Sequence, residues 1–90
     1  MISRKIVIGG QFPFTARRAQ KLVALANSFA SSIILQDSRG TFNGKSLLGI
    51  LSLGKLTGRE LVLLAEGRDE ERAVEALAAE FEAENESAPA

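Results

Sequence analysis

Short runs of apolar and β-branched residues, separated by turn residues, predict four strands along this chain. Residues 2–8 are rich in β-branched side chains and end at two glycines, which is typical of a strand. Residues 32–37 predict a second strand, and after a turn Thr41–Asn43 returns as its hairpin partner. Residues 60–66 predict the fourth strand. Because Leu61–Ala65 is apolar at every position, we expect this strand to be central in the sheet.

Apolar residues at helical spacing and residues that cap helices predict three helices between and after these strands. One helix follows Thr15, a second, nearly all-apolar helix runs from Leu47 to Leu53 and ends near Gly54, and a third follows Asp69 as its N-cap. The order β-α-β-β-α-β-α predicts an α+β sandwich with helices on one face of a mainly antiparallel sheet. The residues of the first and last helices that we expect to be buried are Ala19, Leu22, Val23, Ala26, Phe29 or Ala30, and Ala73, Val74, Leu77, Ala78 and Phe81.

Polar residues in the first helix fall outside its apolar stripe. They are Arg17, Arg18 and Lys21, and we expect all three to be exposed, with little structural consequence at Arg18. Thr15 is expected to cap this helix with its hydroxyl, and Ser46 to cap the short apolar helix.

Length and composition limit the chain to one small domain without common catalytic groups. The 90 residues include no cysteine and no histidine, which removes thiol chemistry, the commonest metal ligand and the usual base at neutral pH. Residues 1–84 are expected to form the domain and residues 85–90 a frayed tail. With no membrane-length apolar run and no disulfide, we expect a cytoplasmic protein. These features favour a binding or carrier module over an enzyme, and no cofactor or metal site is expected.

The formal net charge is zero, but the charges are unevenly distributed. Residues 1–60 carry nine basic and two acidic side chains, whereas residues 61–90 carry two basic and nine acidic ones. An acidic, solvated last helix explains this distribution, and a basic docking face for an anionic partner is the alternative. Neutral net charge and the absence of tyrosine and tryptophan argue against direct nucleic-acid binding.

Three segments of the chain, residues 14–19, residues 44–54 and residues 65–71, together form a recognisable pattern. In their order and spacing they resemble the HPr family, the histidine-containing phosphocarriers of the bacterial sugar phosphotransferase system. The middle segment, with Lys45-Ser46 followed by an apolar helix, is similar to the family's regulatory-serine motif. The resemblance covers about residues 2–84 and implies an HPr-like open-faced β-sandwich, with a four-stranded antiparallel sheet and three helices on one face.

The first of these segments departs from the family pattern at its reactive residue. Thr15 stands where the family has its phosphorylated histidine, and Arg18 stands where it has a proline, while Arg17 keeps the family's arginine. A threonine phosphate is a stable ester with a poor leaving group, so we expect no phosphohistidine relay and no catalytic residue. The chain most resembles a catabolite-repression subfamily that lacks the histidine, although that position is typically glutamine there. Phosphorylation of Thr15 itself remains the alternative to a purely capping role.

The resemblance implies regulation at Ser46. In the family, HPr kinase/phosphorylase phosphorylates the matching serine, and the phosphoprotein acts with a LacI-type catabolite-control regulator. It implies partner contacts at Arg17, Lys45, Leu47, Leu48 and Leu51, and some of these leucines should form an exposed patch because a nearly all-apolar helix cannot bury every side. Some members of the subfamily dimerise by exchanging strands, so the resemblance leaves both a monomer and a homodimer as alternatives. Two alternatives remain: a phosphocarrier-type component of the transport system, and a protein-binding module that is independent of phosphorylation.

Overall fold

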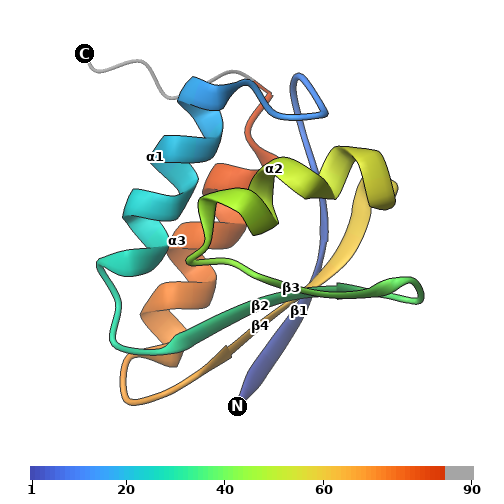
Figure 1. Ribbon diagram of the computed structural model, residues 1–90. Helices are drawn as coiled ribbons and strands as arrows, with labels where there is room; N and C mark the ends of the chain where they lie inside the picture. The colour runs from blue at the N-terminus through green and yellow to red at the C-terminus, as the bar shows by residue number, and fades with distance from the viewer. Residues whose placement is uncertain (85–90) are drawn as a thin grey trace.

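A four-stranded antiparallel sheet forms one layer of the molecule, and three helices cover one of its faces (Figure 1). The computed structural model describes residues 1–84, and the predicted tail, residues 85–90, lies outside the described residues. The strands are β1 (Ile2–Val7), β2 (Ser32–Asp37), β3 (Gly40–Asn43) and β4 (Glu60–Glu66). Their spatial order is β1-β4-β2-β3, so β4 pairs on both sides and is central, as its apolar run predicts.

The helices are α1 (Ala16–Asn27), α2 (Leu47–Leu56) and α3 (Glu70–Glu82), and they confirm the predicted element order and fold class. The side chains from the two layers meet in one core. Its largest fully buried members are Ile6, Ile8, Ile33, Leu35 and Leu63 from the sheet side and Ile50, Leu53, Val74, Leu77 and Phe81 from the helices. Every residue of α3 that was predicted to be buried is buried, and in α1 the predicted residues Ala19, Leu22 and Ala26 are buried. Among the described residues, no helix is both long and apolar enough to cross a membrane.

Helix α2 is longer than the sequence predicts, because it continues through Gly54 to Leu56. The glycine is explained by a close approach, because a Cβ at position 54 would lie 2.3 Å from Cβ of Pro13. Gly54 therefore does not end the helix but lets the loop before α1 pack directly on it. The helix ends at Thr57, whose N–H and hydroxyl both donate to the Leu53 carbonyl.

Asp69 occupies the N-cap position of α3, but the predicted side-chain cap is wrong. Its carboxylate instead accepts hydrogen bonds from the Ala30 N–H at 2.8 Å, the Ser31 N–H at 2.9 Å and the Ser31 hydroxyl at 2.5 Å. The Ser31 hydroxyl, followed by these main-chain donors, lowers the pKa of Asp69 from its ordinary 3.8 to about 2. The side chain thus joins the α1–β2 connection to the β4–α3 turn.

Candidate functional site

The residue at the family's histidine position caps α1. Thr15 has extended backbone angles, and its Oγ1 accepts a hydrogen bond from the Arg18 N–H at 3.1 Å. This geometry confirms the predicted capping role, since a hydroxyl at this position satisfies one of the free N–H groups of the first turn.

In the loop before Thr15 two phenylalanine rings pack against each other, and an arginine guanidinium lies over each of them. The rings of Phe12 and Phe14 meet edge to face with centroids 5.2 Å apart. The Arg18 guanidinium lies 5.0 Å from the Phe14 centroid, and the Arg59 guanidinium lies 5.6 Å from the Phe12 centroid. Such cation–π contacts and the aromatic pair stabilise one conformation of the loop.

Arg18 is buried, so the prediction that it is exposed and structurally unimportant is wrong. Only 5% of the residue is exposed. Its guanidinium donates to five main-chain carbonyls, which belong to Gly9, Gln11, Glu80, Phe81 and Ala83. Three of these carbonyls end α3, where the helix dipole favours a positive charge. Arg18 therefore ties α1 to the end of α3 and to the loop after β1.

Arg59 holds the same loop from the other side. Its Nη1 donates to the Ile8 carbonyl at 2.8 Å and to the Gly10 carbonyl at 2.9 Å, while Arg18 donates to the carbonyl of Gly9 between them. A Cβ at Gly9 would lie 2.3 Å from the Glu82 carbonyl oxygen, which explains why this position has no side chain. Together the two arginines hold the carbonyl groups of three successive residues, Ile8, Gly9 and Gly10, in the loop that precedes Thr15 in the sequence.

Ser46 is the N-cap of α2. Its Oγ accepts a hydrogen bond from the Gly49 N–H at 3.2 Å, and its N–H donates to the Asn43 carbonyl at 3.1 Å. The Asn43 side chain accepts the Lys45 N–H at 2.9 Å, so the short turn after β3 presents Ser46 at the helix start. The first turn of α2 contains no acidic residue. A negative group on Ser46 would therefore face unopposed helix N–H groups and the positive end of the helix dipole.

Lys45 lies next to Ser46 in sequence, but its ammonium group forms a hydrogen bond with another part of the chain. Nζ donates to the Phe29 carbonyl at 2.8 Å, just beyond the end of α1. The Asn27 side chain also donates to the Lys45 carbonyl at 3.1 Å. Lys45 is thus a half-buried tie between α1 and the start of α2.

The three leucines predicted to contact a partner differ in exposure. Leu48 is 77% exposed and Leu47 is 38% exposed, whereas Leu51 is partly buried against the core. Leu56, at the other end of α2, is 55% exposed. The expectation that part of this helix remains an exposed apolar patch is confirmed for Leu47 and Leu48.

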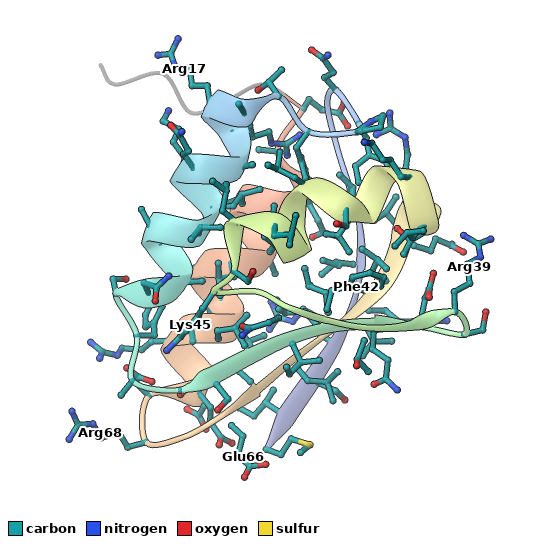
Figure 2. The ribbon with its side chains drawn as sticks, in the orientation of Figure 1. Arg17, Arg39, Phe42, Lys45, Glu66 and Arg68 are labelled. Carbon is teal, nitrogen blue, oxygen red and sulfur yellow. The ribbon has the colours of Figure 1, made fainter. Side chains whose placement is uncertain are left out.

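The predicted site residues fall into two groups at opposite ends of α1. Lys45 contacts the chain just after α1, and Gly54 at the other end of α2 packs on Pro13, just before α1. Figure 2 shows Arg17 and Lys45 far apart, at the two ends of α1. With a rise of about 1.5 Å per residue, the twelve residues of α1 span about 18 Å. Arg17 is therefore not placed to contact a phosphate on Ser46, and the exposed face of α2 joins the two ends.

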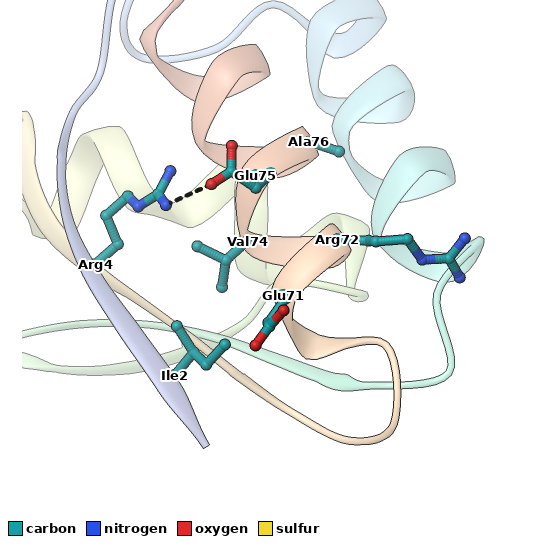
Figure 3. A pocket seen from close by; sticks show the side chains of 7 residues that line it. All are labelled: Ile2, Arg4, Glu71, Arg72, Val74, Glu75 and Ala76. Atoms are coloured by element: carbon teal, nitrogen blue, oxygen red, sulfur yellow. Dashed lines mark hydrogen bonds and ion pairs between the residues drawn. The ribbon is translucent and has the colours of Figure 1, made fainter.

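A groove between β1 and α3 lies away from both groups (Figure 3). It has a volume of about 640 Å³, and an exposed ion pair of 2.9 Å between Arg4 and Glu75 stands at its rim. Among residues 1–84, no three histidine, cysteine or acidic side chains are grouped to hold a metal ion.

Comparisons with known proteins decide the family. Residues 2–83 match the family described as the PTS HPr component phosphorylation site. The chain belongs to the HPr family. It is 38% identical over 79 residues to the HPr-like protein Crh of Bacillus subtilis, which covers 88% of this chain and 93% of that one.

Solved structures of HPr-family members agree with the fold. The phosphocarrier protein HPr of Bacillus anthracis superposes with a TM-score of 0.80 at 34% identity, covering 90% of this chain and 96% of that one. Crh of Bacillus subtilis, solved as a swapped, intertwined dimer, superposes with a TM-score of 0.68 at 36% identity, covering 90% and 88% of the two chains. HPr-family proteins are phosphocarriers or, in the Crh group, regulatory proteins rather than enzymes, and this chain is an HPr-like protein of that kind.

The structural roles of the buried Arg18 and of Arg59 are what the sequence analysis missed. Arg18 lies four residues before Leu22 and eight before Ala26, so it shares the face of α1 that enters the core. That spacing was a usable signal for burial. Arg59 offers no such signal, because its partners are main-chain groups 49 and 51 residues away.

Proposed function

We propose that this protein is a regulatory interaction protein of the HPr family that does not relay a phosphoryl group through histidine. The observation that carries this proposal is the residue at the relay position. Thr15 replaces the histidine, its hydroxyl caps α1, and the whole chain contains no histidine. A threonine ester lacks the labile phosphorus–nitrogen bond that rapid onward transfer needs.

The regulated residue in this proposal is Ser46. It stands at the start of α2 beside the exposed Leu47 and Leu48, and the first turn of the helix has no acidic group. A phosphate would add a charge of about −1.5 to −2 next to an apolar patch without entering the core. HPr kinase/phosphorylase is the proposed modifying enzyme. A LacI-type catabolite-control regulator is the proposed reader, acting in the cytoplasm.

The test of this mechanism is phosphorylation by HPr kinase/phosphorylase with ATP, located by intact and peptide mass spectrometry. We expect one phosphate on wild-type protein and none on Ser46→Ala. Ser52→Ala is the matched control, because Ser52 lies on the same helix and its hydroxyl donates to the Leu48 carbonyl. No phosphate on wild-type protein, with a histidine-containing HPr labelled in parallel, would contradict kinase control and leave a phosphorylation-independent binding module.

The second candidate is a phosphocarrier-type component, favoured by the relatives named HPr. A phosphoryl donor of the sugar phosphotransferase system distinguishes it. We expect the donor to label a histidine-containing HPr and to leave this chain unlabelled at Thr15. Phosphate on Thr15 that is then transferred to a downstream acceptor of the same system would instead support this second candidate.

We further propose that the protein self-associates as a homodimer. Crh of Bacillus subtilis, which shares 36% of its residues with this chain, was solved as a dimer. A dimer would present two copies of α2 to a regulator, and two-site binding raises apparent affinity without new contacts.

A further inference from the structure

Two hydrogen bonds that the proposed function does not use tie the turn before α2 to the end of α1. The side chain of Asn27, the last residue of α1, donates from Nδ2 to the Lys45 carbonyl at 3.1 Å. In the opposite direction, the Lys45 ammonium donates to the Phe29 carbonyl at 2.8 Å. Figure 2 shows the Lys45 side chain directed from the turn toward the segment that follows α1. Lys45 is therefore held to the end of α1 through both its main chain and its side chain.

The bond from Asn27 acts on the peptide group that directly precedes Ser46. This group consists of the Lys45 carbonyl and the Ser46 N–H, and a peptide group is planar. Its carbonyl accepts from Asn27, and its N–H donates to the Asn43 carbonyl at 3.1 Å. Because both polar atoms of the plane are bonded to other parts of the chain, the orientation of the plane is fixed. The direction in which the Ser46 side chain leaves the main chain depends on this orientation.

The positions on either side of this peptide group are held by nearer parts of the chain. The Gly44 N–H donates to the Ile33 carbonyl at 2.8 Å, and a Cβ at Gly44 would lie 2.5 Å from Cγ2 of Ile33, so the turn lies directly on β2. On the other side, the Ser46 Oγ accepts from the Gly49 N–H at 3.2 Å. These bonds stay within residues 33–49, whereas the bond from Asn27 connects the turn to α1.

We propose that Asn27 is a positioning residue for the modification of Ser46, because it holds the peptide group before the serine in the orientation in which a kinase meets the hydroxyl. Ordering a reacting group before association lowers the entropic cost of binding it correctly. Asn27 acts through the Lys45–Ser46 peptide group rather than on the hydroxyl itself. This inference rests on the proposed phosphorylation of Ser46 and concerns how that site is presented to the modifying enzyme.

Replacing Asn27 has little effect on the rest of the fold. Asn27 is exposed, and its other hydrogen bond, to the Val23 carbonyl at 2.9 Å, lies within α1. Alanine has a higher helix propensity than asparagine, which offsets part of the lost hydrogen bonding. We therefore expect Asn27→Ala to unfold at nearly the same urea concentration as the wild type. An effect of this substitution on Ser46 is then separable from a general loss of stability.

Steady-state phosphorylation of the full-length protein by HPr kinase/phosphorylase with ATP tests the positioning role. We expect kcat/KM for Asn27→Ala to be about fivefold lower than for the wild type, mainly through a higher KM, since a less ordered turn weakens ground-state and transition-state binding alike. Ser28→Ala is the matched control. Ser28 is also exposed, and its hydroxyl donates to the Leu25 carbonyl at 2.6 Å, so this substitution removes a hydrogen bond at the end of α1 and leaves the turn before α2 unchanged. It should be phosphorylated like the wild type.

Amide hydrogen exchange, measured by NMR without the kinase, separates positioning from direct contact between Asn27 and the enzyme. We expect the Ser46 N–H to exchange about fivefold faster in Asn27→Ala than in the wild type, because its hydrogen bond to the Asn43 carbonyl opens more often. In Ser28→Ala the exchange of this N–H should be unchanged. Faster exchange together with slower phosphorylation supports the positioning role.

The outcomes distinguish this inference from the proposed phosphorylation on which it rests. A wild-type protein that the kinase leaves unphosphorylated overturns both. Phosphorylation of Asn27→Ala with the wild-type kcat/KM overturns the positioning role alone. Slower phosphorylation with unchanged Ser46 exchange also overturns it, because Asn27 then contacts the kinase directly. An equal loss of kcat/KM in Ser28→Ala overturns it as well, because the loss then reflects the end of α1 in general.

Discussion

At the scale of single residues, Arg18 has the largest structural consequence in the candidate site. Replacing it with alanine removes a buried cation that five carbonyls share, three of them at the end of α3. We expect Arg18→Ala to lower the free energy of unfolding by about 2–4 kcal/mol, because buried carbonyls lose charged donors. Urea denaturation measures this loss. Arg17→Ala, at the exposed neighbouring position, should change stability by less than about 0.5 kcal/mol, and equal effects of the two substitutions would contradict the role given to Arg18.

Asp69 is a residue whose ionisation affects stability in acid. Its pKa is lowered to about 2 in the folded protein by the Ser31 hydroxyl and nearby N–H donors, against an ordinary 3.8. Because the folded-state pKa is depressed, the stabilisation is complete above about pH 4 and is lost as the pH falls toward 2. We expect Asp69→Asn to destabilise the protein at neutral pH, with the difference from wild type shrinking across this window. Thermal unfolding at several pH values measures it. A pH-independent difference, or an equal effect of the exposed Glu71→Gln, would contradict this.

The residues also show what sequence patterns can and cannot predict at this scale. The capping roles of Thr15 and Ser46 are local, since each hydroxyl bonds an N–H three residues ahead, and the sequence predicted both. The bonds of Asp69 reach 38 and 39 residues back, and those of Arg18 reach 62 to 65 residues ahead. Such long-range bonds depend on the assembled fold, so a pattern of neighbouring residues gives no measure of them.

At the scale of elements, the contact between α2 and the loop before α1 reverses the usual effect of a helical glycine. In an exposed helix interior, glycine to alanine stabilises by about 1 kcal/mol. At Gly54 the added Cβ would lie 2.3 Å from Pro13, so we expect Gly54→Ala to destabilise by about 1–3 kcal/mol and to shift the NMR signals of Thr15. Gly58→Ala is the control, because no atom lies within 4 Å of a Cβ there. A Gly54→Ala variant that is more stable than the wild type would contradict this prediction, because it would show that the loop around Pro13 moves away at little cost.

The same contact explains where element prediction failed. The strand and helix order follows from hydrophobic period, and the bounds of β2 and β4 agree with the sequence prediction. The end of α2 was predicted at Gly54 because glycine commonly ends helices. Here the glycine serves a close approach between elements, and the helix continues for two more residues. Only the packed structure distinguishes these two uses of glycine.

At the scale of the whole molecule, the two layers give the chain two separate surfaces. The helix layer presents Ser46 and the exposed leucines of α2, and the sheet layer presents an outer face on which a few apolar side chains lie among polar ones. The sequence showed that β4 is apolar on both faces and therefore central. It did not show that one face stays uncovered in residues 1–84, because burial of a strand depends on which layers the chain actually supplies.

This separation predicts that recognition of the Ser46 phosphoprotein depends on one end of α2. Leu48 is 77% exposed, so Leu48→Ala removes little core packing and should change stability by less than about 0.5 kcal/mol. Beside a phosphate it provides the apolar part of the proposed docking surface, and we expect its loss to weaken binding of a LacI-type regulator about tenfold. Calorimetric titration of the phosphorylated protein measures this. Leu56→Ala is the control: Leu56 is 55% exposed on the same helix but about 12 Å further along it, and it should bind nearly as the wild type does. Equal losses of affinity at both positions would show that the docking surface extends along the whole of α2. Unchanged affinity in Leu48→Ala would show that this leucine does not contact the regulator.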